Sequence, residues 1–422
     1  MAILLLSVCL IAGADEGGPQ AVPFSVLTLS TQGSTRGTGY PASNKIVTLD
    51  DVTYMTWLDS VSIVRARTYD RRTRKLSPVV EVGRGHDNHG GPSLCSDSEG
   101  YLHIAYGPHS HPFQYRRTLR PGDITEWTPV ERFGEKATYP SLVCDSRDTL
   151  HIAYRQSKDP WKLMYQQKPK GQPWSEPVAL VVSPVPEGYT NWGNALALDK
   201  NDRLHLGFHI YTTQKYAAGI AFGYLYSDDH GAAWHTTCGN VLTLPGTLES
   251  CEPVEMNTDM DIRVGNLVAD NHGTVYMTVV GRKPGQRKAG ELWLLEDRTW
   301  RPVDLMPFLE APWNHISDAV VSVTQDGTIC VAVSSGAYAW QDPAKEIWLL
   351  ISRDRGETFT AQAISEIDPD QPNWLPNIER NMGHTPVRVP HFLFTHGGPG
   401  QDNESESATG IQFVVLQNDP AE

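Results

Sequence analysis

SDSEGYLHIAYG, residues 96–107, joins an acidic, glycine-containing turn to a short strand of alternating residues. The same pattern returns four times, as DSRDTLHIAYRQ (145–156), DKNDRLHLGFHI (199–210), DNHGTVYMTVVG (270–281) and QDGTICVAVSSG (325–336). Equivalent strand positions recur at intervals of roughly 50 to 70 residues, which suits four strands per repeat. Because helical periodicity is nearly absent, the repeat predicts an all-β propeller.

Two more copies bring the predicted number of blades to seven. KIVTLDDVTYMTWLD (45–59) lies upstream, and the last copy combines VRVPHFLFTHG (387–397) with GIQFVVLQ (410–417). The early strand FSVLTLST (24–31) has no blade of its own, so we expect it to pair with 410–417 and close the ring, which removes open sheet edges. Residues 22–418 are predicted to form a single seven-bladed β-propeller domain.

Two further segments, SDDHGAAW (227–234) and SRDRGETF (352–359), share the spacing S-x-D-x-G-x-x-W/F. They resemble Asp boxes, the turns between the third and fourth strands of sialidase-type (BNR) propeller blades. In such a turn the Asp side chain caps backbone amides and the Gly takes a positive φ. The boxes therefore support the fold and indicate little about the chemistry.

The amino-terminal residues 1–14, MAILLLSVCLIAGA, are apolar and end in small residues, as in a signal peptide. The segment predicts a secreted or periplasmic protein, and no later stretch is apolar for long enough to predict a membrane span. The formal net charge of −14 argues against binding to nucleic acid, which requires clustered Lys and Arg. An anionic substrate would need a local positive field at its site.

The topology of an up-and-down blade sends the unusual histidines and tyrosines to one face. Loops between the second and third strands open on the same face as the loops between blades. His89 precedes an innermost strand, His109 follows the second strand of that blade, and Tyr154 and Arg155 end the next second strand. The same reasoning places Tyr189, Trp192, His209 and Tyr211 at this mouth. Imidazole and phenol groups gathered at one mouth are what a proton-transfer site requires.

The motif DNHGGP (87–92), the histidine 20 residues after His89 and the strand YLHIAYG (101–107) resemble the propeller polysaccharide lyases, notably the ulvan lyases. The resemblance implies that His89 is the catalytic histidine and His109 the second one, with His111 as an alternative. It implies Tyr154 as the catalytic tyrosine, with Tyr189 as an alternative, and Tyr211 as a substrate contact. Arg155, Lys168 and Lys170 are alternatives for the cation that neutralises the substrate carboxylate.

Such lyases cleave an anionic, uronic-acid-containing polysaccharide by β-elimination and leave an unsaturated sugar. The reaction needs a base for the C5 proton, an acid for the C4 oxygen and a cation on the neighbouring carboxylate. We expect His89 to be the base, Tyr154 the acid, and His109 with Arg155 or a lysine to hold the carboxylate. Because the sequence gives no distances, base and acid could exchange roles.

The resemblance also implies a zinc ion, since members of the group can carry one. A His and Cys set assigned to the mouth could hold it, namely His209, Cys251, His315 and His384. The alternative is a Cys238–Cys251 disulfide in an exported protein.

Two other functions remain open at the level of sequence. A sialidase-like glycoside hydrolase would share the Asp boxes, but the histidine-rich mouth has no role in that mechanism. A non-catalytic carbohydrate-binding propeller would keep an aromatic rim and lose the acid–base pair. Because His89, His109 and Tyr154 are all present, the lyase is the favoured prediction.

Overall fold

The computed structural model describes residues 21–158, 160–184, 190–212, 219–256, 262–282, 288–313, 315–336, 343–383, 385–398 and 408–417. In these residues the regular structure consists of β-strands and one short 3₁₀ helix, η1 (Met306–Phe308), so the all-β prediction is confirmed. No helix in the described ranges is both long and apolar enough to span a bilayer.

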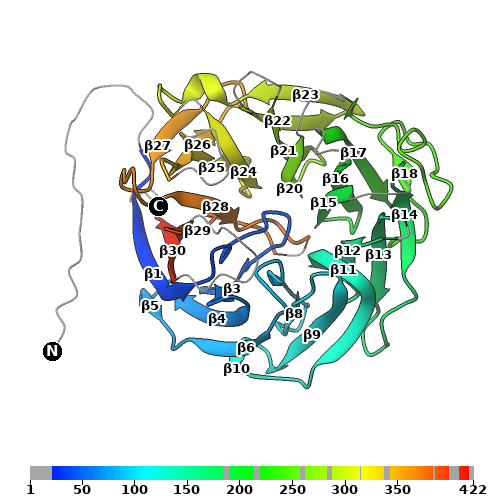
Figure 1. Cartoon of the computed structure of the whole chain (residues 1–422), viewed down its shortest axis with the longest axis horizontal. Coiled ribbons are helices and arrows are strands. Elements are labelled where there is room, and N and C mark those ends of the chain that lie inside the picture. Colours follow the sequence, from blue (N-terminus) through cyan, green and yellow to red (C-terminus); the bar gives the residue numbers. More distant parts are fainter. Residues whose placement is uncertain are drawn as a thin grey trace.

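The described strands form five antiparallel sheets that surround a central axis, as in a propeller (Figure 1). The largest sheet has the order β28 (Asn373–Ile378), β29 (Phe392–His396), β30 (Thr409–Leu416), β1 (Phe24–Gly33), β3 (Val52–Asp59), β4 (Ile63–Asp70), β5 (Lys75–Leu76), with β2 (Ile46–Leu49) paired to β3 and β6 (Val80–Arg84) paired to β4. The next sheet has the order β14 (Val178–Val182), β13 (Lys162–Lys168), β12 (Leu150–Gln156), β11 (Glu131–Cys144), β9 (His111–Arg120), β8 (Leu102–Tyr106), β7 (Ser93–Ser96), with β10 (Asp123–Trp127) paired to β9.

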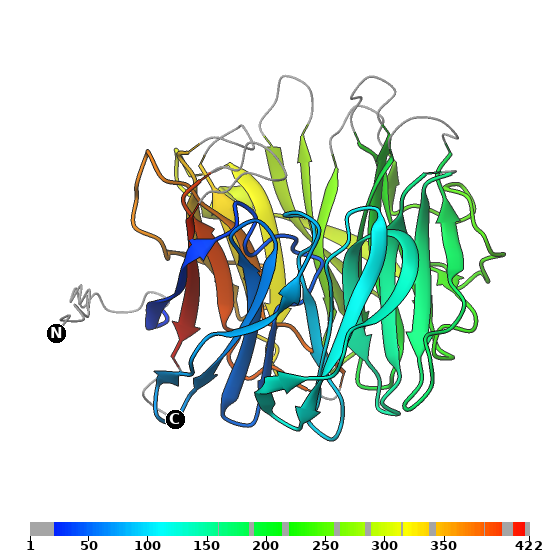
Figure 2. The same cartoon turned by 60° about the horizontal axis from the view of Figure 1, so that its bottom comes forward.

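The other three sheets follow chain order. The first contains β15 (Thr190–Leu198), β16 (Leu204–Thr212), β17 (Gly219–Ser227) and β18 (His235–Thr236), with β19 (Glu255–Met256) paired to β17. The second contains β20 (Arg263–Ala269), β21 (Val275–Arg282), β22 (Lys288–Glu296) and β23 (Thr299–Asp304). The third contains β24 (Ile316–Val323), β25 (Ile329–Ser335), β26 (Glu346–Ser352) and β27 (Thr360–Ala363). Figure 2 shows that many of the loops gather at the two ends of the ring.

The predicted pairing of the two ends of the chain is confirmed. β1 runs antiparallel to β30, from the pair Phe24 and Leu416 to the pair Gly33 and Thr409. This pairing places the first and last described strands side by side in one sheet. It gives β30 a partner on each edge, because β29 lies on its other side.

The repeated Asp turns and the Asp boxes also form as expected. In the Asp turn after β11, for example, Asp145 Oδ1 accepts the backbone amides of Arg147 and Thr149 at 2.9 and 2.8 Å. The box at 227–234 lies between β17 and β18, and its Trp234 is fully buried. Apolar side chains between neighbouring sheets make up the core.

Candidate active site

A tight turn in the loop between β6 and β7 positions the first functional groups. Asp87 Oδ1 accepts the backbone amide of His89 at 2.8 Å, and the Asp87 carbonyl accepts the amide of Gly90 at 3.0 Å. A Cβ atom at Gly91 would lie 2.6 Å from the carbonyl oxygen of Gly39. Glycine is therefore required at residue 91, because this loop packs directly against the segment 34–45.

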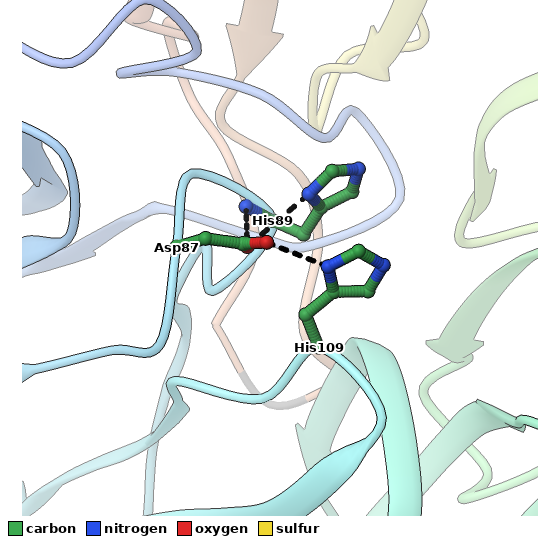
Figure 3. Close-up of side chains that lie close together, drawn as sticks. All are labelled: Asp87, His89 and His109. Carbon is green, nitrogen blue, oxygen red and sulfur yellow. Dashed lines mark hydrogen bonds and ion pairs between the residues drawn. The ribbon is translucent and has the colours of Figure 1, made fainter. Parts of the chain in front are cut away.

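Two imidazoles share the carboxylate of Asp87 (Figure 3). His89 Nδ1 lies 3.2 Å from Asp87 Oδ1, and His109 Nδ1, from the loop between β8 and β9, lies 2.6 Å from Asp87 Oδ2. The two rings stack with their centroids 4.0 Å apart and an interplanar angle of 21°. The structure thus brings together the two histidines that the sequence singles out, and Asp87, which sequence reasoning missed, anchors both.

The charges in this cluster follow from burial and hydrogen bonding. Burial would raise the pKa of Asp87, but hydrogen bonds from His109 and His89 lower it well below its usual range. Burial lowers the pKa of His89 to about 4, against the opposing effect of its hydrogen bond with Asp87. At neutral pH Asp87 is therefore ionised and His89 is neutral. An ionised carboxylate only accepts hydrogen bonds, so His89 carries its proton on Nδ1 and has a lone pair on Nε2.

That lone pair faces a cation from the segment 34–45, which connects β1 to β2. Arg36 Nη1 lies 2.7 Å from His89 Nε2 and donates to the Tyr40 hydroxyl at 2.6 Å. The Tyr40 ring stacks near His89, with centroids 5.7 Å apart. A guanidinium cannot accept a hydrogen bond, so this contact agrees with the Nδ1–H tautomer of His89. No motif in the sequence pointed to Arg36 or Tyr40.

Two buried basic side chains, Arg380 from a distant loop and Lys45 at the end of the segment itself, hold the segment 34–45 in place. Arg380 donates from Nη1 to the Ala42 carbonyl at 3.1 Å and from Nη2 to the Pro41 carbonyl at 2.6 Å. Lys45, which is fully buried, donates to the Pro92 carbonyl at 3.0 Å. These bonds tie Arg36 and Tyr40 to the loop that carries His89.

A second tyrosine, Tyr139, completes the aromatic wall. It lies in β11 at a break in the register with β12, with a φ of 61°. Its ring centroid is 4.7 Å from that of Tyr40 and 6.2 Å from that of His89. The guanidinium of Arg155, on β12, lies 4.5 Å from the Tyr139 centroid and 5.0 Å from that of Trp161. Arg155 has no exposed surface, so it supports Tyr139 from behind.

A cavity of about 100 Å³ adjoins Tyr40 and Tyr139. Its polar wall includes Asn194, His209, Arg263, Ser317 and Asp318. His209 Nδ1 accepts the backbone amide of Val264 at 2.9 Å, so a neutral His209 has its proton on Nε2. We define the mouth site as Arg36, Tyr40, Asp87, His89, His109 and Tyr139, together with this cavity.

The assignment of the acid to Tyr154 is corrected by the structure. Tyr154 is fully buried, and its hydroxyl donates to Gln166 Oε1 at 2.8 Å. Its ring packs edge-on against Phe113, at a centroid distance of 5.2 Å. Side chains along β12 point alternately to its two faces, and that of Tyr154 points into the core. The irregularity in β11 instead places Tyr139 beside His89.

The assignment of a lysine to the substrate carboxylate is corrected as well. Lys168 lies at the opposite end of the β12–β13 hairpin from Arg155, paired with Leu150, and its Nζ donates to the Gln172 carbonyl at 2.7 Å. Lys170, near that end, forms an ion pair with Asp148 at 2.8 Å. Neither lysine can neutralise a charge beside His89.

His111 is exposed, and its Nδ1 lies 2.7 Å from the His109 carbonyl oxygen rather than on Asp87. Tyr189 and His384 lie outside the described residues. Tyr211 is in β16, and its side chain is outside the described part.

Of the predicted zinc set, only His209, Cys251 and His315 lie within the described residues, and His384 lies outside them. Within the described ranges, which do not include His384, no group of three metal-ligand side chains contains His209, Cys251 or His315. Cys251 packs in the apolar core, and His315 is buried immediately before β24. Cys238 is exposed and Cys251 buried, and both are free thiols, so the alternative disulfide does not form either.

Comparisons with known proteins agree with this architecture. Residues 52–304 match the model of a BNR repeat-containing family member. No curated protein matches the sequence. Among solved structures, an ulvan lyase of polysaccharide lyase family PL25 aligns with a TM-score of 0.73 at 14% identity, over 91% of this chain and 94% of its own.

The same ulvan lyase bound to -[GlcA(1-4)Rha3S]- gives a TM-score of 0.72 at 14% identity, over 91% of this chain and 94% of its own. The polysaccharide lyase Uly1 gives 0.63 at 12% identity, over 93% of this chain and 99% of its own. At these identities the likeness concerns the fold, which is that of the propeller-type ulvan lyases.

Proposed function

This chain belongs to the BNR repeat-containing family, and we propose that it is a polysaccharide lyase that cleaves a uronic-acid-containing, ulvan-like polysaccharide by β-elimination. The fold shared with ulvan lyases supports the class of reaction. The observation that carries the proposal is a neutral His89, held by an ionised Asp87, with its free nitrogen facing Arg36.

His89 Nε2 is the base in this proposal. The lone pair is available at neutral pH because the pKa of His89 is lowered to about 4. Asp87 fixes the ring through Nδ1 and stabilises the positive charge that develops when Nε2 takes the C5 proton. In the absence of substrate, Nε2 is occupied by the guanidinium of Arg36.

Arg36 is the cation that neutralises the uronate. A guanidinium binds a carboxylate through two parallel hydrogen bonds, which are stronger than its single bond to a neutral imidazole. When Arg36 turns to the carboxylate at C5, it makes the C5 proton more acidic and frees His89 Nε2 to accept that proton. The turn of the Arg36 side chain thus both acidifies the C5 proton and releases the base that removes it. His109, whose ring is 28% exposed, donates from Nδ1 to Asp87 and stacks on His89, so it helps to hold the base in place.

Tyr139 takes the role of acid and protonates the C4 oxygen as the bond to the next sugar breaks. Its ring lies beside His89 and lines the cavity, and Arg155 stacks behind it. The electron pair from the C5–H bond forms the C4–C5 double bond and the C4–O bond breaks. The products are an unsaturated uronyl end and a free hydroxyl on the other fragment.

We also propose that residues 22–418 make one domain of seven blades. Each of the three smaller sheets is one unit of four consecutive strands, and one of them has the short β19 added at β17. The nine-stranded sheet divides into two units where β1 meets β3 at the single pair Gly33 and Asp59, and the eight-stranded sheet divides between β9 and β11. We further propose that residues 1–14 direct export, so amino-terminal sequencing of protein from the culture medium or periplasm should find them removed.

The function is tested by incubating the purified protein with a panel of uronate polymers, ulvan among them, and following the ultraviolet absorbance of the unsaturated product. Elimination produces a double bond, whereas a sialidase-like hydrolase would release saturated sugars. Affinity for the polymers without any turnover would instead establish a carbohydrate-binding protein. Either of these two outcomes would overturn the lyase proposal.

A further inference from the structure

A repeated polar unit lies at the end of the sheets that carries the Asp turns. It consists of an Asp after an innermost strand, a His six residues later and a Tyr on the third strand. The three copies are Asp97, His103 and Tyr115; Asp145, His151 and Tyr165; and Asp199, His205 and Tyr224. In each copy the His Nε2 faces the Asp, and the His Nδ1 lies 2.6 to 2.7 Å from the Tyr hydroxyl.

Only the second copy acquires another imidazole among the described residues. His230 Nδ1 lies 2.9 Å from Asp145 Oδ2, the same oxygen that lies 3.2 Å from His151 Nε2. His230 comes from the Asp box at 227–234 in another sheet, and its φ is 58°. The equivalent residue of the other box, Arg355, instead forms an exposed ion pair with Glu296.

The box is fitted closely to this unit. Tyr165 donates its hydroxyl proton to the His230 carbonyl at 3.1 Å. A Cβ atom at Gly231 would lie 2.1 Å from that hydroxyl, so only glycine allows the contact. Both the backbone and the ring of His230 are therefore fixed against the second copy.

This contact changes the proton arrangement of the second copy. A Tyr hydroxyl has one proton, so if Tyr165 donates it to His230, His151 Nδ1 must donate to Tyr165. A neutral His151 then directs the lone pair of Nε2 at the carboxylate of Asp145, 3.2 Å away. Two facing lone pairs repel each other unless a proton or a metal ion lies between them, and a bound metal ion satisfies both while His151 stays neutral. In the other copies, within the described residues, the Tyr115 and Tyr224 hydroxyls have no second hydrogen-bond partner and can donate to the imidazole, so its Nε2 can carry the proton that faces the Asp.

We propose that Asp145 Oδ2, His151 Nε2 and His230 Nδ1 bind a divalent transition metal ion of the zinc class. The three donor atoms lie within 4.8 Å of one another. Donors around a tetrahedral zinc at 2.0–2.1 Å are about 3.3 Å apart, close to the distances of 2.9 and 3.2 Å from Asp145 Oδ2. Asp145 and His151 are fully buried, while the His230 ring is 23% exposed and gives the ion a route from solvent.

The surrounding hydrogen bonds match those that orient metal ligands. Asp145 Oδ1 is held by two backbone amides, and His151 Nδ1 is held by Tyr165. Because His230 belongs to a different sheet from Asp145, the ion would join the two sheets. The site lies at the end of the β11–β12 hairpin opposite to Tyr139 and Arg155, so it is separate from the mouth site.

The proposal is tested on the full-length protein, stripped with a chelator and dialysed, by titrating zinc and measuring bound metal and the thermal unfolding midpoint. The variant is His230→Gln. The matched control is His272→Gln, which alters an exposed histidine in another Asp turn. Because Asp87, His89 and His109 also form a trio, His109→Gln identifies metal bound at the mouth site.

We expect one zinc per chain and a higher unfolding midpoint in the wild type, in His272→Gln and in His109→Gln. His230→Gln should bind zinc at least tenfold more weakly and lose the stabilisation. The proposal is overturned if the wild type binds no stoichiometric zinc, if His230→Gln keeps wild-type affinity, or if only His109→Gln loses the metal. Metal content and stability are read without substrate, so the outcome does not depend on the lyase assignment.

Discussion

The His89 imidazole is poised as a base because burial keeps it neutral. Replacing it by alanine should lower kcat/KM on the preferred polymer by roughly 10² to 10⁴, the usual contribution of a general base. The wild-type kcat/KM should fall as the pH drops through about 4, because protonation then removes the lone pair. Initial rates of unsaturated product across pH, with circular dichroism of the variant, measure both effects.

His111 provides the matched control for this experiment. It lies two residues from His109 but is exposed and does not contact Asp87. H111A should keep a rate within about twofold of the wild type. Equal losses in H89A and H111A would mean that the imidazole of His89 has no special role in the reaction.

The two tyrosines near β12 should separate activity from stability. Y139F removes the proposed acid and should lower kcat by roughly 100-fold without unfolding the protein. Y154F removes the donor to Gln166 in the core and should cost about 1–3 kcal/mol of stability while the rate is retained. Denaturant melts and steady-state kinetics of both variants test this, and the reverse pattern would restore Tyr154 as the acid.

At the scale of single residues, the sequence predicted the proximity of His89 and His109, because their short separation along the chain determines it. His89 and His109 flank one short β7–β8 hairpin, so their loops open at the same end wherever that blade lies. Tyr139 was missed because alternation along a strand does not reveal the bulge and the positive φ that redirect it. The resemblance implies Tyr154 from its spacing to the two histidines, but spacing along the chain does not show that the side chain of Tyr154 points into the core.

The strand β1 can be tested as an element. Deleting residues 1–33 removes the partner of β30 and exposes its edge, so the protein should unfold at markedly lower denaturant concentration or aggregate. Deleting only residues 1–20 leaves the whole of β1 and should not change stability. Urea midpoints and light scattering compare the two, and equal stability of both deletions would show that the pairing contributes nothing.

At the scale of elements, the position of β1 could be predicted from the sequence, whereas the path of the segment that follows it could not. The partner of β1 could be predicted because β1 has the alternating pattern of a strand but belongs to no repeat. The strand at 410–417 had an edge without a predicted partner. The path of residues 34–45 could not, because it depends on buried hydrogen bonds to distant parts of the chain, from Arg380 to Ala42 and from Lys45 to Pro92. The residues around Arg36 in the sequence therefore contain no motif that predicts its place in the mouth site.

For the molecule as a whole, buried neutral histidines predict acid sensitivity. Burial lowers the pKa of His391 to about 3 and that of His89 to about 4, whereas an unfolded histidine titrates near 6.5. Between these values the unfolded state binds more protons, so stability falls as the pH drops from about 6.5, by about 1.4 kcal/mol per pH unit for each proton. Denaturant melts at several pH values should show a shallower slope for H391L than for the wild type.

The net charge of −14 predicts how the KM for an anionic polymer depends on salt. A chain of this charge repels an anionic polymer at long range, while Arg36 attracts the carboxylate only at contact. Salt shortens the Debye length to about 8 Å at 0.15 M, which screens the repulsion more than the partly buried contact. KM should therefore fall as salt is raised from near zero to about 0.15 M, with kcat nearly constant. A KM that instead rises steadily with salt would mean that a broad positive field, rather than Arg36 alone, recruits the substrate.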